Sequence, residues 1–269
     1  MKYIDDYTVF GDTNIEFVSR LELIFERFRK HNLYLKASKC FSGYSEVEFF
    51  GKVVSEKGLQ ISRTKIQSVL DFPLPIVSKQ LKSFLGTANY LRDLVRDYST
   101  ISQPLHQLLT DYNKTRRVVW TPESTAAFHE TKLAISKCTT MHFMSDIAPI
   151  TLHTDTSDYG VVYLFQTVDG IEQPVAFVSR SLNKSQLRWS VIQKEAYGIF
   201  YSCMYLQSLL RDRFFTIRTD HRNLLFITEA SNPMIVRWYM ALSEFSFSLE
   251  FIPGVMISQI LSLVYVVII

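Results

Sequence analysis

Residues 150–160 begin with the alternation of apolar and polar positions that is typical of a β-strand. Ile150, Leu152 and Thr154 fall on one face, and the intervening positions, including His153 and Asp155, fall on the other. The pattern therefore predicts a strand that delivers the carboxylate of Asp155 at its end, opposite the apolar face.

Further strand patterns follow this one. Residues 160–166 and 173–179 predict two strands joined through the turn sequence Asp169-Gly170. Residues 214–219 predict a fourth strand, and alternating apolar residues over 245–251 predict a last one. With the helix expected between the third and fourth strands, this half of the chain predicts an α/β domain.

Three acidic residues lie at the ends of these strands or on the helix between them. Asp155 closes the first strand, Asp220 directly follows the fourth, and Glu195 lies at the edge of the apolar face of the intervening helix. Each of them alone is more often an N-cap or an ion-pair partner. They would converge only if the two strand ends are neighbours and the helix packs over them.

The chain opens with a second acidic pattern. Residues 2–10 favour a hairpin with Asp5 and Asp6 at its turn. An isolated acidic pair of this kind is commonly a solvated turn, and two carboxylates alone do not define a metal site.

The rest of the first 61 residues predicts a small sheet backed by a helix. Apolar residues at helical spacing over 14–31 predict an amphipathic helix, with Asp12 or Thr13 as its N-cap. A strand is expected over 33–35 and a hairpin over 47–55.

Residues 62–110 change to short helices separated by prolines, with an apolar stripe along one side. Four basic residues lie outside that stripe: Lys79, Lys82, Arg92 and Arg96. They are equally compatible with a solvated helix face and with contacts to phosphate groups. A further helix is expected after Thr121, the N-cap, and Pro122, its first residue.

The composition of the chain limits the classes of protein to which it can belong. The chain has 269 residues, 47% of them hydrophobic and 20% charged, which suits two globular domains and excludes wholesale disorder. A net charge of +3 does not by itself indicate nucleic-acid binding. Three widely spaced cysteines argue against a disulfide framework or a zinc site, and the amino terminus lacks a secretory signal. We therefore expect an intracellular protein.

The first half resembles the palm of a gypsy-like LTR-retrotransposon reverse transcriptase. The resemblance rests on an ordered series that starts with the Tyr-Ile-Asp-Asp turn and continues through the helix, Lys39-Cys40, Phe49-Phe50-Gly51, Val53-Val54-Ser55 and Gly58. It implies that Asp5 and, less directly, Asp6 bind metal during nucleotide addition. Residues 81–90 resemble the thumb of the same enzymes. This resemblance implies that four basic residues contact a template-primer duplex: Lys79, Lys82, Arg92 and Arg96.

The second half resembles the ribonuclease H domain that follows the reverse transcriptase in these retroelements. The matching words include Thr154-Asp155-Thr156-Ser157, Lys194-Glu195 and Thr219-Asp220-His221. The resemblance implies that Asp155, Glu195 and Asp220 hold two divalent ions, Mg²⁺ or alternatively Mn²⁺, that cut the RNA strand of an RNA-DNA hybrid. It implies no small-molecule cofactor.

Two departures from the family shape the expectations. The family's palm has another essential Asp upstream of the Tyr-x-Asp-Asp turn, so we expect no polymerisation from this chain. No carboxylate occurs after Glu250, where the family carries a fourth metal ligand, so cleavage is expected to fall by orders of magnitude.

The apolar stretch 261–269 is too short to span a membrane. A truncated or decayed element copy is the favoured explanation, and a short anchor is the alternative.

The combined prediction is a partial palm (1–61), a thumb (62–112), a connector (113–148), a ribonuclease H-like mixed sheet flanked by helices (149–254) and an apolar tail (255–269). The predicted activity is Mg-dependent endonucleolytic hydrolysis of RNA in RNA-DNA hybrids, beside an incomplete RNA-directed DNA polymerase region. The expected location is the cytoplasm, in particles, or the nucleus, without secretion or membrane insertion, and the oligomeric state stays open. The rival interpretations are a decayed nucleic-acid-binding remnant and a host-adopted interaction protein.

Overall fold

The computed structural model describes residues 2–3, 6–110, 116–156, 159–224 and 232–254. The chain divides into two compact units, Met1–Ser45 and Glu46–Ile269. This division falls earlier than the boundary expected after residue 61, and the five-part division stays a prediction.

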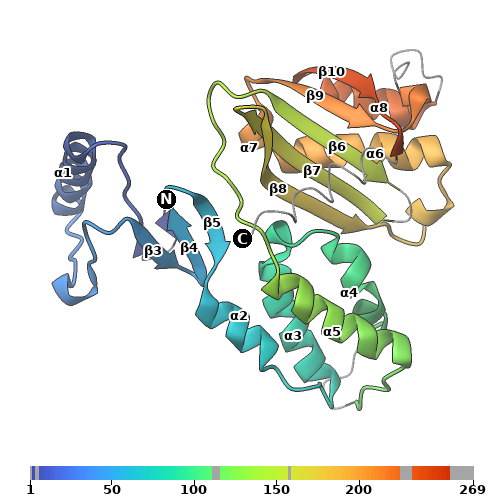
Figure 1. Cartoon of the computed structure of the whole chain (residues 1–269), viewed down its shortest axis with the longest axis horizontal. Coiled ribbons are helices and arrows are strands. Elements are labelled where there is room, and N and C mark those ends of the chain that lie inside the picture. Colours follow the sequence, from blue (N-terminus) through green and yellow to red (C-terminus); the bar gives the residue numbers. More distant parts are fainter. Residues whose placement is uncertain (1, 4–5, 111–115, 157–158, 225–231, 255–269) are drawn as a thin grey trace. The chain divides into compact units, whose positions relative to one another are not determined.

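The N-terminal unit contains a very short hairpin and one long helix (Figure 1). Strands β1 (Lys2–Tyr3) and β2 (Asp6–Tyr7) pair antiparallel, as in the predicted hairpin. Asp6, which was expected at the turn, instead lies in β2 and pairs with Tyr3. Helix α1 (Asn14–Lys30) starts at the N-cap Thr13, whose hydroxyl accepts from the Glu16 amide (3.2 Å). A 3₁₀ turn, η1, covers Ala37–Lys39.

The strand expected over residues 33–35 is wrong. These residues are exposed and pair with no strand in the described part of the unit. Their β-favouring side chains have no neighbouring edge to join, so local propensity alone does not make a strand.

The second unit begins with a three-stranded antiparallel sheet in the order β3-β4-β5. The hairpin β3 (Glu46–Phe49) and β4 (Lys52–Ser55) was predicted, whereas β5 (Gly58–Ile61) was not. A helical region follows, as expected, and consists of α2 (Arg63–Leu70), α3 (Ser78–Tyr90), η2 (Arg92–Leu94), α4 (Tyr98–Gln107) and α5 (Pro122–Ser136).

The larger sheet of this unit has five strands in the order β10-β9-β6-β7-β8. Its strands are β6 (Ile150–Thr156), β7 (Tyr159–Val168), β8 (Ile171–Ser181), β9 (Phe214–Thr219) and β10 (Ser246–Phe251). β6, β7 and β8 form the predicted antiparallel meander, and β9 pairs parallel to both β6 and β10. Both residues of the Asp169-Gly170 turn have positive φ angles (52° and 77°), as a tight hairpin turn requires.

Helices cover both faces of this sheet. Helix α6 (Val191–Tyr205) lies against one face (Figure 1), and the 3₁₀ turn η3 (Gln186–Arg188) precedes it. Helices α7 (Gln207–Leu210) and α8 (Pro233–Leu242) complete this side, and α8 was not predicted. On the other face, Tyr163, Phe165 and Phe177 join the hydrophobic core of the helical region. The α/β class of the second half is therefore confirmed.

The face of β6 that reads as polar in the sequence is buried, apart from Asp155. His153 is fully buried, and its Nε2 lies 3.7 Å from Glu172 Oε1. Arg218 contacts the same Glu172 oxygen (3.3 Å) and Glu250 (3.1 Å). The polar face of a strand becomes interior here because the helical region packs over part of it and paired charges cover the rest.

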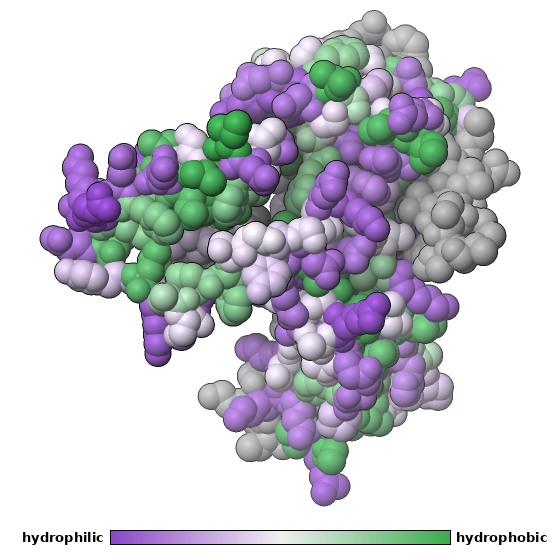
Figure 2. Space-filling view, turned by 60° about the vertical axis from the view of Figure 1, so that its left-hand side comes forward, coloured by the Kyte–Doolittle hydropathy of each residue, from purple (hydrophilic) through white to green (hydrophobic). Residues whose placement is uncertain are grey.

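The surface of the chain is mixed rather than uniformly hydrophilic. Figure 2 shows hydrophobic residues interspersed with hydrophilic ones on the face that it presents. No helix formed by the described residues combines the length and apolar character needed to cross a membrane.

Candidate active site

The first condition for convergence of the acidic residues is met by the pairing of β6 with β9. The two strands are parallel neighbours, and Thr154 lies opposite Thr219. Asp155 and Asp220 each follow one of these paired residues. Since parallel strands end at the same edge of a sheet, the two carboxylates leave adjacent strands side by side.

The third carboxylate comes from α6. Glu195 is only 4% exposed, and its Oε1 accepts a hydrogen bond from the amide of Thr156, the last residue of β6 (3.1 Å). One turn later, Gly198 lets the helix approach this closely, because an added Cβ would overlap the Thr156 hydroxyl. The other oxygen, Glu195 Oε2, is buried and has no hydrogen-bond partner among the residues that the structure describes.

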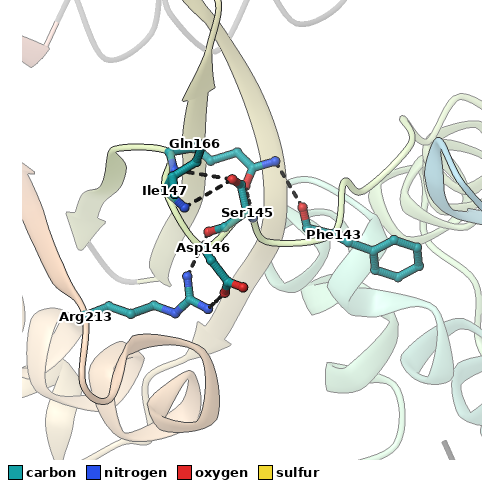
Figure 3. A network of polar contacts seen from close by, with 7 residues as sticks. Phe143, Ser145, Asp146, Ile147, Gln166 and Arg213 are labelled. Atoms are coloured by element: carbon teal, nitrogen blue, oxygen red, sulfur yellow. Dashed lines mark hydrogen bonds and ion pairs between the residues drawn. The ribbon is translucent and has the colours of Figure 1, made fainter. Parts of the chain in front are cut away.

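The start of β6 is held by polar contacts at the opposite end of the strand (Figure 3). Gln166 of β7 accepts from the Ser145 amide (2.7 Å) and donates to the Phe143 carbonyl (3.0 Å). Arg213 donates to the Ser145 carbonyl (2.7 Å) and pairs with Asp146. The segment that leads into β6 is thus tied to two other parts of the domain.

The three acidic residues are electrostatically coupled. Burial, together with the negative charges of Asp155 and Asp220, raises the pKa of Glu195 to about 8, against the opposing effect of the Thr156 amide. Although Asp155 reaches solvent, partial desolvation and the charges of Asp220 and Asp97 raise the pKa of its carboxyl as well. Among the described residues, no basic side chain opposes the pKa shifts of these two carboxyls.

This donor set fits a hard divalent cation. All the acids offer carboxylate oxygens, and the buried Glu195 Oε2 has an open hydrogen-bonding capacity. As it stands, however, no group of three or more His, Cys, Asp or Glu side chains in the described part of the chain is placed to hold a metal ion. Side chains alternate along β6, so Asp155 starts on the face away from α6 and Glu195.

The end of β10 passes directly beside Asp220. The Ile252 amide donates to the Thr219 carbonyl (3.0 Å), and a Cβ added to Gly254 would lie 2.8 Å from Asp220 Oδ2. The stretch in which a fourth ligand was expected begins immediately after this glycine. It lies outside the described residues.

The predicted polymerase residues belong to the N-terminal unit. Asp6 lies in β2 opposite Tyr3, and its side chain is outside the described part of the chain. Asp5 is outside the described residues altogether. Their predicted role stays a prediction.

The four predicted nucleic-acid-binding residues divide into two pairs. Lys79 and Lys82 are exposed on α3. Arg92 donates to the Ser179 carbonyl, and the Arg96 guanidinium pairs with Asp97 (3.2 Å) and lies over the Tyr163 ring. Arg92 and Arg96 therefore contact the large sheet of their own chain.

Residues 92–99, which include Arg92 and Arg96 and are called the basic segment below, contact the large sheet through several hydrogen bonds. The sequence did not predict these contacts. Asp97 has a left-handed φ of 53° and makes no side-chain cap for α4; instead it accepts a hydrogen bond from the Tyr163 hydroxyl. Burial and this neighbouring carboxylate raise the pKa of Tyr163, which keeps the hydroxyl a donor. The Ser99 amide donates to Ser179 Oγ (3.1 Å). An Asp before a helix signals an N-cap, and nothing in that signal points to a tyrosine on a distant strand.

A family model matches this half of the chain. Residues 146–245 match the RNase H-like domain found in reverse transcriptase. The chain is also 33% identical over 262 residues to the Tf2-3 transposon polyprotein of Schizosaccharomyces pombe, and 32% identical to the Tf2-7 polyprotein of the same organism. These matches cover 94% of this chain and 19% of each relative, so the chain spans about a fifth of the length of the relatives.

Solved structures share the fold. A foamy viral protease-reverse transcriptase in complex with an RNA/DNA hybrid superposes with a TM-score of 0.76 at 18% identity, covering 91% of this chain and 34% of that one. The same kind of protein in complex with dsDNA gives 0.74 at 17% identity, covering 91% and 52%. At such identities the likeness extends to the fold alone.

Proposed function

We propose that this chain is a divalent-metal-dependent ribonuclease acting on RNA-DNA hybrids, because residues 146–245 match the RNase H-like domain found in reverse transcriptase and the chain as a whole resembles retrotransposon polyproteins. The proposed reaction is endonucleolytic hydrolysis of the RNA strand. Asp155, Glu195 and Asp220 are the proposed metal ligands, with Mg²⁺ or Mn²⁺ as the ion.

One observation carries the proposal. The parallel register of β6 and β9 brings Asp155 and Asp220 to one sheet edge, where the buried Glu195 shares their electrostatic environment. Ordinary ion pairing does not explain Glu195, because none of its described contacts is to a basic side chain and its Oε2 has no hydrogen-bond partner. A buried carboxyl of this kind is costly to ionise unless a cation accompanies it.

The chain's own residues define what happens at this edge. Without a cation, Glu195 holds a proton near neutral pH, because its pKa is about 8. Asp155, Glu195 and Asp220 would hold the cation, and Glu195 would have to give up its proton to do so. When bound, divalent ions supply a water of lowered pKa and stabilise the leaving oxygen. Asp155 and Asp220 are both exposed, so both are open to an approaching phosphate backbone in this proposal.

The proposed partner is a nucleic-acid duplex, either an RNA-DNA hybrid or a template-primer. The two solved relatives were seen with an RNA/DNA hybrid and with dsDNA, which supports this class of partner. Lys79 and Lys82 are the exposed candidates for phosphate contact on α3. Arg92 and Arg96 are proposed to contribute mainly by holding the basic segment to the sheet.

The N-terminal unit is proposed to be part of an RNA-directed DNA polymerase region, with Asp5 and Asp6 as its metal-binding residues. The antiparallel pairing of Lys2 with Tyr7 supports a hairpin at this position. We further propose that the chain acts inside the cell, in the cytoplasm or nucleus. Its three cysteines are free, as expected for a reducing compartment.

Cleavage of a labelled hybrid by the purified chain tests the nuclease proposal. Asp155→Asn should lower the rate in Mg²⁺ or Mn²⁺ at least about 100-fold, because loss of a metal ligand removes several kcal/mol of transition-state stabilisation. Asp169→Asn is the matched control: the same charge is removed at an exposed turn whose left-handed φ suits Asn. It should cleave like the unmodified chain.

Two outcomes would overturn the proposal. One is cleavage that is unaffected by Asp155→Asn, which would identify a contaminating nuclease. The other is hybrid binding without any metal-dependent cleavage, which would favour a nucleic-acid-binding remnant. Circular dichroism of each variant checks that the fold is intact.

A further inference from the structure

An exposed arginine lies at the acidic edge of the large sheet. Arg222 comes two residues after Asp220, and its guanidinium carbon lies 4.5 Å from the centroid of the Phe251 ring. Phe251 is the last residue of β10 and pairs with Thr219, the last residue of the neighbouring strand β9 (Figure 1). The proposed metal ligands do not include this arginine, so its place beside them has a separate cause.

The Phe251 ring belongs to the side of the sheet that α6 covers. Leu249, two residues earlier on β10, packs against the hydrophobic core that contains Ile199 of α6. Residues two apart on a strand project from the same face, so Phe251 shares this side. Glu195 also approaches the acidic edge from α6. The ring that carries the Arg222 guanidinium thus lies on the side from which Glu195 comes.

The charge of Arg222 is not used within the described part of the chain. No carboxylate there pairs with it, and no basic side chain opposes the raised pKa of the Asp155 or Glu195 carboxyl. Arg218 on the same strand shows the contrast, because it pairs with two carboxylates at 3.1 and 3.3 Å. Arg222 therefore offers a positive charge to a partner from outside the chain.

The contact with the ring prepares the guanidinium for a phosphate group. A guanidinium that lies over an aromatic face is held in place, while the N–H donors at its rim stay available. These donors form a fork that matches two phosphate oxygens. Asp155 and Asp220 are exposed and repel a phosphate backbone, so a cation beside them favours its approach.

We infer that Arg222, supported by the Phe251 ring, binds a backbone phosphate of the RNA-DNA hybrid at the acidic edge. The inference rests on the proposed function, because it takes the hybrid as the partner. It adds a binding residue that positions the nucleic-acid strand beside Asp155, Glu195 and Asp220. A contact to phosphate oxygens fixes the position of the strand without reading its sequence.

Binding of a fluorescein-labelled RNA-DNA hybrid to the full chain tests the inference. Fluorescence anisotropy is measured in EDTA, where metal-dependent cleavage does not occur. Arg222→Gln should weaken binding about tenfold and lower the slope of log affinity against log salt by about 1, because one phosphate contact is lost. Arg222→Lys should keep the slope but regain only part of the affinity, since an ammonium group lacks the fork. Phe251→Leu should weaken binding about two- to threefold at an unchanged slope.

Arg211→Gln provides the matched control. Arg211 is an exposed arginine just before the start of β9, at the opposite end of the strand, where it pairs with Glu244 (3.1 Å). This variant should bind the hybrid like the unmodified chain. Equal losses in the two glutamine variants, an unchanged affinity of Arg222→Gln, or no hybrid binding by the unmodified chain would overturn the inference. Cleavage in Mg²⁺ is measured separately, so Arg222-dependent binding without cleavage would refute the nuclease and leave this inference standing.

Discussion

The acidic residues of the N-terminal unit and those of the second unit are held by structures of very different size. Asp6 belongs to a hairpin whose strands have two residues each, in a unit where Phe28 is the one buried apolar side chain among the described residues. Asp155 and Asp220 follow neighbouring strands of a five-stranded sheet that has helices on both faces. Both sequence motifs place a carboxylate beside a strand, but the strands of the second unit are packed into a hydrophobic core and those of the N-terminal unit are not.

This difference shows what a sequence motif needs in order to become a site. In the N-terminal unit, large apolar residues such as Ile15 and Tyr34 are 84% and 92% exposed, so they add little to a core. In the second unit, the close approach of α6 to β6 at Gly198 fixes the position of Glu195. Catalytic groups keep their geometry when rigid elements on several sides hold them.

The buried acid of the second unit should make stability depend on pH. The folded state raises the pKa of Glu195 from 4.5 to about 8, so the folded chain binds a proton that the unfolded chain has released. Without metal, the free energy of unfolding should therefore fall by up to a few kcal/mol as pH rises through this window, and then level off. Urea unfolding in EDTA, from about pH 5 to about pH 9, measures the change.

Glu195→Gln should flatten this pH profile, because glutamine does not titrate. Glu130→Gln is the matched control on the exposed side of α5 and should retain the slope. A profile with the same slope in both variants would mean that other groups dominate and that Glu195 is not a strained buried acid.

The contact between α6 and β6 should be intolerant of a single methyl group. Gly198→Ala places a Cβ against the Thr156 hydroxyl and should lower the free energy of unfolding by about 1–3 kcal/mol. Gly86→Ala makes the same change within α3, where no atom outside the neighbouring backbone of the helix lies within 4 Å of the new Cβ, and should raise stability by about 0.5–1 kcal/mol. Denaturant melts of the two variants compare them directly. Equal effects of the two substitutions would refute close packing of α6 on β6.

Substitution of one N-cap threonine in each unit compares how far the loss of a helix cap destabilises that unit. Thr13 caps α1 and Thr121 caps α5, and in both helices the hydroxyl accepts from the amide three residues on. Replacement of either threonine by alanine should cost about 1 kcal/mol of helix stability. Thr121→Ala should lower the stability of the whole second unit, whereas Thr13→Ala should increase amide exchange only within the N-terminal unit. Global destabilisation by Thr13→Ala would show that the two units unfold together.

Local patterns predicted much of the fold. The alternation over Ile150–Thr156, the Asp169-Gly170 turn and the Thr121-Pro122 helix start all appear in the structure, because neighbouring residues determine them. Strand β5 and helix α8 were missed. β5 depends on pairing with β4 and on a bridge between Leu59 and Met141, which are far apart in the sequence.

The candidate site was predictable as a set of residues but not as an arrangement. The sequence positions of Asp155 and Asp220 do not indicate that their strands are parallel neighbours, since that depends on the crossover through α6. The burial of His153 and the contact of Asp97 with Tyr163 likewise arise from packing between regions distant in sequence. These contacts have no local signature, so no periodicity could reveal them.

The proposed cation site requires Asp155, Glu195 and Asp220 to be electrostatically coupled. Titration of the Glu195 side chain by ¹³C NMR measures this coupling. In EDTA the Glu195 carboxyl should titrate at about pH 8, Asp155→Asn should lower that value, and saturating Mg²⁺ should move it far lower. A carboxyl that titrates near its ordinary value of 4.5 and responds neither to Asp155→Asn nor to Mg²⁺ would contradict the account.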